Sequence, residues 1–142
     1  MFKKIIETLY LKQKGNLAYY DGLTGLHNRL YYEKVLKRKY LKSEFYVTIL
    51  DINDLKKIND TQGHLAGDKI IIETVDIIKT EDFIDAFRFG GDEFVVFSEY
   101  EIPLSQYSWL FSYGVHKKLS SENLDIALEA ADKELIANKE LK

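Results

Sequence analysis

The sequence predicts an α/β fold, in the form of an α+β sandwich whose helices flank a central sheet. Short runs of aromatic and β-branched residues, typical of strands, alternate along the chain with longer segments whose apolar residues recur at helical spacing. Of the 142 residues, 46% are hydrophobic and only one is proline, as expected for a single domain built mostly of regular elements. Helices layered on a shared sheet would bury the apolar faces of both.

Residues 1–19 are expected to form an N-terminal helix, ahead of a compact domain at residues 20–142. The apolar residues of this helix follow helical spacing: Phe2, Ile5, Ile6, Leu9, Tyr10 and Leu17. The stripe formed by Phe2, Ile5, Ile6 and Leu9 has two possible roles, because it could pair with its copy in a second subunit or pack back onto its own domain. The domain begins with a glycine-containing loop at residues 21–29, followed by a helix at residues 30–41.

The rest of the chain supplies the sheet and two more helices. We expect a strand at 45–50 that ends at Asp51, followed by a helix that starts beside Gly63-His64 and Gly67-Asp68. Two strands follow at 86–89 and 93–97, around Gly90-Gly91. The chain then forms a strand at 108–115 and a helix at 121–139 that is capped by Ser120 or Ser121. Gly-Gly suits a type I′ hairpin turn, which needs positive φ at both central residues.

Composition and charge exclude several classes of site and partner. The chain has no cysteine, which rules out disulfides, thiolate nucleophiles and thiolate metal centres. The net charge of −3 gives no electrostatic preference for DNA or RNA, and no apolar run is long enough to span a membrane. The first residues lack the apolar stretch and cleavage site of a signal peptide, so we expect a cytoplasmic protein with no membrane partner.

Two acidic clusters are candidates for a metal site. Asp51 and Asp54 follow a buried strand, and Asp92-Glu93 lie at a hairpin tip. A strand end and an adjacent hairpin tip can bring two carboxylates to one divalent ion, and Mg²⁺ commonly takes one or two carboxylates plus substrate phosphates. The alternative on spacing alone is that Asp51 caps a turn and Asp92 is an ordinary hairpin residue, because turns are rich in aspartate.

Three motifs, taken together, resemble the GGDEF family of diguanylate cyclases. They are Asp21-Gly22-Leu23-Thr24-Gly25-Leu26-His27-Asn28-Arg29, the segment 51–68 from Asp51-Ile52-Asn53-Asp54 to Gly67-Asp68, and Arg88-Phe89-Gly90-Gly91-Asp92-Glu93-Phe94. The motifs match in order and in spacing. The resemblance covers residue 20 to the C-terminus, weakens after Phe97, and returns at Ala131-Asp132 and Lys139.

This resemblance implies a fold and a reaction. The fold would be like the palm of nucleotide polymerases and class III nucleotidyl cyclases. The reaction would condense two GTP molecules into cyclic di-GMP with release of pyrophosphate, by two-metal-ion catalysis with Mg²⁺ or Mn²⁺, two ions per active site. Each subunit would hold one GTP, so catalysis would need a homodimer with its two sites face to face.

The resemblance also assigns roles to individual residues. The metal ions would be held by the carboxylates of Asp51 and Asp92 and the carbonyl of Ile52; the guanine edge by Asn59 and Asp68; and the phosphates by the backbone N–H groups of Asp54 and Leu55 and the ammonium groups of Lys56 and Lys139. Glu93 would lie beside the 3′-hydroxyl and assist its deprotonation. Glu93, Asp92 and Lys56 are thus the expected catalytic residues.

Three features depart from the family pattern. No helical pattern separates Phe97 from Ser108, so one family helix is missing and a region of sheet is expected to be uncovered. An arginine that follows Lys139 in the family has no counterpart, which predicts weaker triphosphate binding. The stretch Glu81-Asp82-Phe83-Ile84 replaces the Arg-x-x-Asp of a product-inhibition site, so no inhibition through that site is expected.

These departures leave two alternatives to an active cyclase. One is a non-catalytic module that binds GTP or cyclic di-GMP, which the missing helix and arginine favour. The other is a related cyclic-nucleotide synthase. The presence of Asp51, Asp92, Glu93, Asn59 and Asp68 favours the active cyclase.

Overall fold

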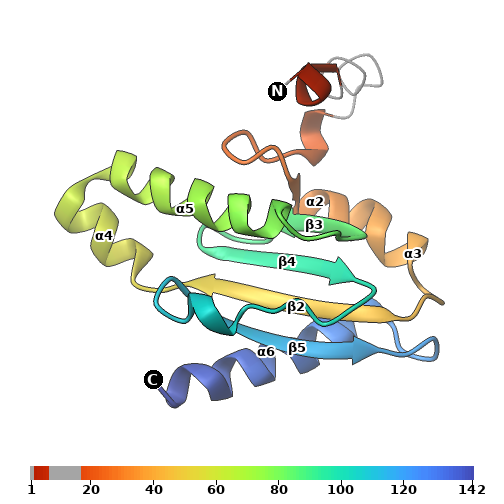
Figure 1. Ribbon diagram of the computed structural model, residues 1–142. Helices are drawn as coiled ribbons and strands as arrows, with labels where there is room; N and C mark the ends of the chain where they lie inside the picture. Colours follow the sequence, from red (N-terminus) through yellow and green to blue (C-terminus); the bar gives the residue numbers. More distant parts are fainter. Residues whose placement is uncertain (1, 7–16) are drawn as a thin grey trace.

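The computed structural model, which describes residues 2–6 and 17–142, is built on a five-stranded sheet (Figure 1). Its strand order is β1-β3-β4-β2-β5. The strands are β1 (His27–Asn28), β2 (Phe45–Ile52), β3 (Asp85–Arg88), β4 (Glu93–Ser98) and β5 (Phe111–Lys118). Only β1 and β3 are parallel; the other neighbouring pairs are antiparallel. The sheet and its helices confirm the predicted α+β architecture.

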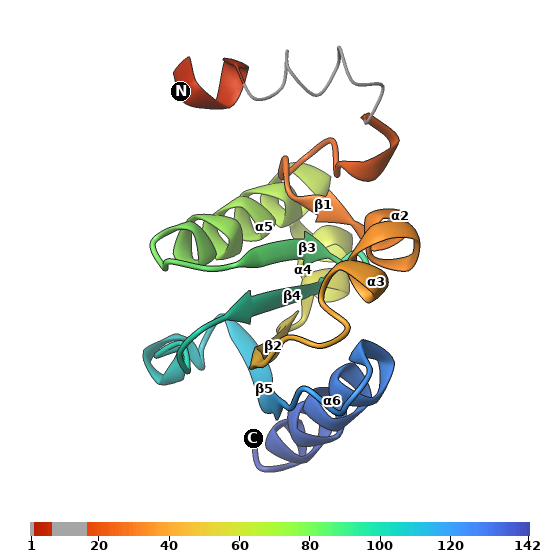
Figure 2. The same cartoon turned by 90° about the vertical axis from the view of Figure 1, so that its right-hand side faces the viewer.

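Helices cover both faces of the sheet, as Figure 2 shows nearly end-on. One face carries α4 (Leu55–Gln62) and α5 (His64–Lys79); the other carries α6 (Leu124–Glu140) and a continuous helical segment made of α2 (Arg29–Tyr31), the π-helical turn η2 (Tyr32–Leu36) and α3 (Lys37–Lys39). Strand alternation divides the core between the two faces. In β2, Val47 and Ile49 pack toward α6, whereas Leu50 and Ile52 pack toward α4 and α5.

The chain around the predicted metal ligands is more regular than predicted. Strand β2 continues through Ile52, so Asp51 lies within the strand rather than after it. Helix α4 was not predicted, because Leu55 is its one buried residue and an apolar stripe is missing. Helix α5 begins at His64, which places Asp68 one turn inside the helix rather than at its start.

Three further boundaries differ from the predictions. Strand β5 begins at Phe111, not at 108. Helix α6 begins after Asn123, whose Oδ1 accepts a hydrogen bond from the Ile126 N–H at 2.9 Å, so neither Ser120 nor Ser121 is the cap. The turn between β3 and β4 is not type I′, because neither of its glycines has positive φ. It is a longer turn, closed by hydrogen bonds from the N–H groups of Phe89 and Gly90 to the Glu93 carbonyl.

Residues 99–110 connect β4 to β5 without an α-helix, as predicted. The segment contains only the 3₁₀ turn η3 (Ser105–Tyr107). It nevertheless buries Ile102, Leu104 and Leu110 against the core beneath α5. The expectation of an uncovered region of sheet is therefore wrong, since an irregular segment supplies the apolar side chains that a helix would have brought.

The described N-terminal residues lie at the β1 edge of the domain, far from α6 (Figures 1 and 2). Residues 2–6 are helical, and Phe2 is 77% exposed there, with Ile5 and Ile6 about half exposed. Leu9, which belongs to the predicted stripe, and Tyr10 of the predicted helix lie outside the described residues. Residues Leu17–Tyr19 form the 3₁₀ turn η1. No helix in the described ranges combines the length and the apolar character needed to cross a bilayer.

Candidate active site

The predicted metal ligands come together where the two central strands meet the β3–β4 turn. Asp51 and Glu93 are directly opposite each other in the β2–β4 pair, so their side chains lie on the same face of the sheet. The N–H of Ile52 donates to the carbonyl of Asp92 at 2.9 Å, which fixes the turn beside β2. The structure thus gathers Asp51, Ile52, Asp92 and Glu93 at one end of the sheet.

Negative charge is concentrated at this point. Burial raises the pKa of Asp51, and the neighbouring Asp92 raises it further, while a hydrogen bond from Lys139 opposes both effects. Burial also raises the pKa of Glu93, with added repulsion from Asp132, Asp51 and Asp92. Crowded carboxylates of this kind are stabilised by a cation.

Lys139 supplies such a positive charge from α6. Its ammonium forms an ion pair with Oδ2 of Asp51, and this contact raises the pKa of Lys139. Lys139 was predicted to bind phosphate. The structure therefore places this lysine at the same carboxylate that was predicted to hold the metal.

The residues present fit Mg²⁺ or Mn²⁺ bound jointly with a phosphate. Asp51 and Asp92 offer two carboxylates, and Ile52 offers a backbone carbonyl at the same strand end. Within residues 2–6 and 17–142, no three histidine, aspartate or glutamate side chains lie close enough to enclose a cation by themselves. Two carboxylates and a carbonyl leave coordination positions for substrate oxygens and water, which is the usual arrangement for Mg²⁺.

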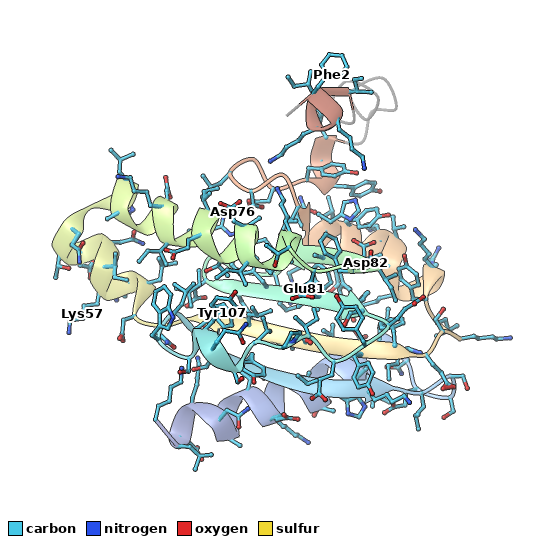
Figure 3. All side chains as sticks on the ribbon, viewed as in Figure 1. Phe2, Lys57, Asp76, Glu81, Asp82 and Tyr107 are labelled. Atoms are coloured by element: carbon cyan, nitrogen blue, oxygen red, sulfur yellow. The ribbon has the colours of Figure 1, made fainter. Side chains whose placement is uncertain are left out.

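The start of α4 provides donors for an anion. Asp54 adopts the left-handed conformation, with φ of 54°, and makes no side-chain cap to the helix. The first N–H groups of an uncapped helix are available to a ligand, and they favour negative charge. A non-glycine residue in this conformation also marks strain of the kind found at functional sites. Lys56 is solvent-exposed on the first turn of the same helix, whereas Lys57 points away from the domain (Figure 3).

The two predicted guanine-binding residues lie on adjoining helices. Asn59 belongs to α4, and its side chain lies against α5 at Gly67, where a Cβ would come within 1.8 Å of Asn59 Oδ1. Asp68 follows immediately on α5. It also lines an open groove along one face of α5, whose lining residues all belong to that helix and do not include Asn59: Leu65, Asp68, Lys69, Ile72, Glu73 and Asp76. Asp76 is labelled on α5 in Figure 3.

An arginine connects the β3–β4 turn to the loop at residues 21–26. The Arg88 guanidinium donates to the Gly91 carbonyl from Nη2 at 2.7 Å and from Nε at 3.2 Å. Its Nη1 also pairs with the Asp21 carboxylate at 3.2 Å. Asp21 in turn accepts hydrogen bonds from the N–H and hydroxyl of Thr24. Arg88 therefore holds the carbonyl that directly precedes Asp92.

Three residues near the site were given no role in the sequence analysis. Asp132 faces Glu93 from α6, and its spacing of seven residues from Lys139, which places both on one helix face, could have indicated this. Asn53 and Lys142 meet beyond the end of β2, where Asn53 Oδ1 and Lys142 Nζ are 3.5 Å apart. Nothing in local sequence patterns brings positions 53 and 142 together.

The stretch expected at the product-inhibition site is acidic and is hydrogen-bonded to Tyr100. The hydroxyl of Tyr100 donates to Glu81 Oε2 at 2.7 Å and accepts a hydrogen bond from the Asp82 N–H at 3.0 Å. Figure 3 labels Glu81 and Asp82 beside the strands, away from α4. A carboxylate therefore stands where the resemblance would have required a guanidinium.

Comparisons with known proteins agree on one family. Residues 18–107 match the family described as diguanylate cyclase, GGDEF domain. The diguanylate cyclase DgcS of Shewanella oneidensis is 36% identical over 103 residues, which cover 68% of this chain and 35% of that protein. The chain spans about a third or less of the curated relatives that it matches.

Solved structures of the same family share the fold. The GGDEF domain of Caulobacter crescentus DgcB, crystallised in complex with c-di-GMP, is 25% identical with a TM-score of 0.72, covering 87% of this chain and 88% of that one. The coiled coil and GGDEF domain of the same protein, also in complex with c-di-GMP, is 24% identical with a TM-score of 0.76, covering 97% of this chain and 90% of that one.

Proposed function

The chain belongs to the GGDEF family of diguanylate cyclases, and from this we propose that it condenses two GTP molecules into cyclic di-GMP and pyrophosphate. The observation that carries the proposal is the meeting of Asp51, Asp92 and Glu93 at one strand end, with Lys139 paired to Asp51. Asp68 supports guanine as the base, because an acidic side chain accepts from the N–H groups of the guanine edge.

The chemistry divides among these residues. We propose two divalent cations, Mg²⁺ or Mn²⁺, which would activate the 3′-hydroxyl and neutralise the leaving pyrophosphate. Asp51, Asp92 and the Ile52 carbonyl would hold them. Glu93, half-buried opposite Asp51, would accept the proton of the 3′-hydroxyl. The 3′-oxygen then bonds to the α-phosphorus of the other GTP as the bond to pyrophosphate breaks, and the step occurs twice.

The triphosphate would lie over the start of α4. The N–H groups of Asp54 and Leu55 would bind its oxygens, with Lys56 and Lys139 supplying positive charge. Lys139 would then exchange Asp51 for phosphate when a cation takes the carboxylate. Asn59 would bind the guanine edge beside Asp68.

Two subunits would be needed for the reaction. One domain offers one set of guanine-binding residues, so the second GTP must come from another copy whose site faces the first. Catalysis would therefore occur in a homodimer, in which each subunit presents its 3′-oxygen to the opposite α-phosphate. We propose that the reaction takes place in the cytoplasm, because GTP is available there.

One observation favours a second function, that of a non-catalytic module that binds GTP or cyclic di-GMP. The family helix that the sequence lacks between β4 and β5 is replaced by the irregular segment 99–110. A single experiment separates the candidates. The protein is incubated with GTP, with ATP, and with both, in Mg²⁺ or Mn²⁺, and the products are identified by mass spectrometry. Cyclic di-GMP from GTP alone is expected. Binding without product would favour the module, and a mixed or adenine product would favour a related synthase.

A further inference from the structure

The ammonium of Lys142 is held in a corner made of neutral oxygens. Its Nζ donates to the carbonyls of Ser108 at 2.7 Å and Phe111 at 3.2 Å, and Asn53 Oδ1 lies 3.5 Å away. None of these oxygens carries a full charge. Among the described residues, Lys139 pairs with Asp51, whereas no ion pair joins Lys142 to an aspartate or glutamate. The ammonium of Lys142 is thus held in place by uncharged oxygens.

The corner lies beside the candidate phosphate site. Asn53 is two residues after Asp51 and directly precedes Asp54, at which the chain turns into α4. Asn53 is itself fixed, since its N–H donates to the Leu110 carbonyl at 3.0 Å and its Nδ2 to the Ser108 carbonyl at 3.1 Å. The ammonium of Lys142 therefore lies at the junction between the end of β2, the start of α4 and the segment before β5.

Lys139 of α6 and Lys142, which follows the end of this helix, approach each other here. Burial lowers the pKa of Lys142, and the positive charge of Lys139 lowers it further. Lys139 is paired with Asp51, and if a divalent cation took that carboxylate, the two ammonium groups would repel each other unless an anion lay near both. With Lys139, Lys142 and the uncapped N–H groups of α4, the corner suits a ligand that carries several negative charges.

We propose that Lys142 is a phosphate-binding residue of this protein, which contacts the terminal phosphates of GTP from the corner formed by Asn53, Ser108 and Phe111. The inference rests on the proposed function for its substrate. An ammonium can make three hydrogen bonds. The long contact to Asn53 Oδ1 is the one that a phosphate oxygen would replace, while the two carbonyls keep the group in place.

The test compares Lys142→Met, which removes the charge at similar length, with Lys142→Arg, which keeps it. Lys133→Met is the matched control, because Lys133 is an exposed lysine of α6, the helix that precedes Lys142, and pairs with Glu129 at 3.7 Å. Calorimetry would measure binding of three probes in the presence of Mg²⁺: a GTP analogue with a non-cleavable α–β bridge, GMP, and inorganic tripolyphosphate.

Lys142→Met should weaken binding of the GTP analogue and of tripolyphosphate about five- to tenfold, and binding of GMP hardly at all. It should also flatten the salt dependence of the first two. Lys142→Arg should retain most of the affinity, and Lys133→Met should match the wild type.

Equal affinities of wild type and Lys142→Met for the two polyphosphates would overturn the proposal, as would a loss of equal size for GMP. A lowered melting temperature with unchanged affinities would assign Lys142 a structural role instead. If the wild type bound tripolyphosphate but showed no preference for the guanine nucleotide, the proposed function would fail, while the tripolyphosphate affinities would still decide the role of Lys142.

Discussion

The amide of Asn59 lies against α5 at Gly67, where an added Cβ would come within 1.8 Å of Oδ1 and 2.8 Å of Cγ. Gly67→Ala should therefore displace the Asn59 side chain without breaking the helix. If Asn59 binds guanine, the KM for GTP should rise about tenfold, the effect of losing one hydrogen bond to a buried partner. Steady-state kinetics measure this change.

Gly22→Ala is the control for this variant, because an added Cβ at Gly22 meets nothing within 4 Å. It should leave both KM and melting temperature unchanged. An unaltered KM in Gly67→Ala, with the fold intact, would argue against a role for Asn59 in base recognition.

Asp21 should make stability depend on pH. Burial raises its pKa, but hydrogen bonds from Thr24 and the charge of Arg88 lower it by more, so the net pKa is below the ordinary value of 3.8. A depressed folded-state pKa contributes stability above the unfolded pKa, and this stability is lost as the pH falls through the folded value. Asp21→Asn should be less stable at pH 7, and its melting temperature should fall less steeply from pH 5 to pH 3. Parallel curves for the two proteins would contradict this.

Site residues could be predicted where sequence neighbours carry the pattern. Asp51 and Asp92-Glu93 belong to short motifs, and the structure brings them together as predicted. Asn53 and Lys142 could not be predicted, because their contact joins positions 89 residues apart through the carbonyls of Ser108 and Phe111. Such contacts depend on the path of the backbone in space, which the spacing of apolar residues along the sequence does not predict.

The contact between β5 and α6 sets the position of Lys139 and Lys142. At Gly114 an added Cβ would lie 2.2 Å from the Ala131 carbonyl oxygen and 2.3 Å from the Leu135 nitrogen. These are backbone atoms that cannot rotate away. Gly114→Ala should therefore push α6 from the sheet, lower the free energy of unfolding by about 3 kcal/mol, and reduce turnover.

Chemical denaturation of Gly114→Ala measures the first effect, with Gly22→Ala as the control for the same chemical change. A stability within experimental error of the wild type would mean that α6 accommodates the methyl group. The close packing described between β5 and α6 would then be wrong.

The helices and strands that bury many apolar side chains were the ones that the sequence predicted best. Strands β2 and β4 and helices α5 and α6 carry clear patterns and appear at or near their predicted positions. Helix α4 was missed because it buries only Leu55. Residues 108–110 were predicted as strand from their apolar character, yet Leu110 is buried in a turn whose carbonyl accepts from Asn53.

At the scale of the whole molecule, the proposed reaction needs two competent subunits. If Asp92→Ala subunits are mixed with wild type at constant total protein and allowed to exchange, turnover should follow the square of the wild-type fraction. An equal mixture would then retain about a quarter of the activity rather than half. Measuring initial rates across mixing ratios distinguishes a quadratic from a linear dependence on the wild-type fraction. A linear dependence would show that one subunit acts alone.

The central claim is that Asp51 and Asp92 form the metal site of a cyclase that uses GTP. The most direct measurement compares wild type and Asp92→Ala for the ratio of pyrophosphate released to cyclic di-GMP formed, with melting temperature as the check on folding. The wild type should release two pyrophosphates for each cyclic di-GMP, and the variant should form neither product while remaining folded, since the cation loses one of its two carboxylates. Near wild-type turnover in Asp92→Ala, with the same metal requirement, would contradict the account.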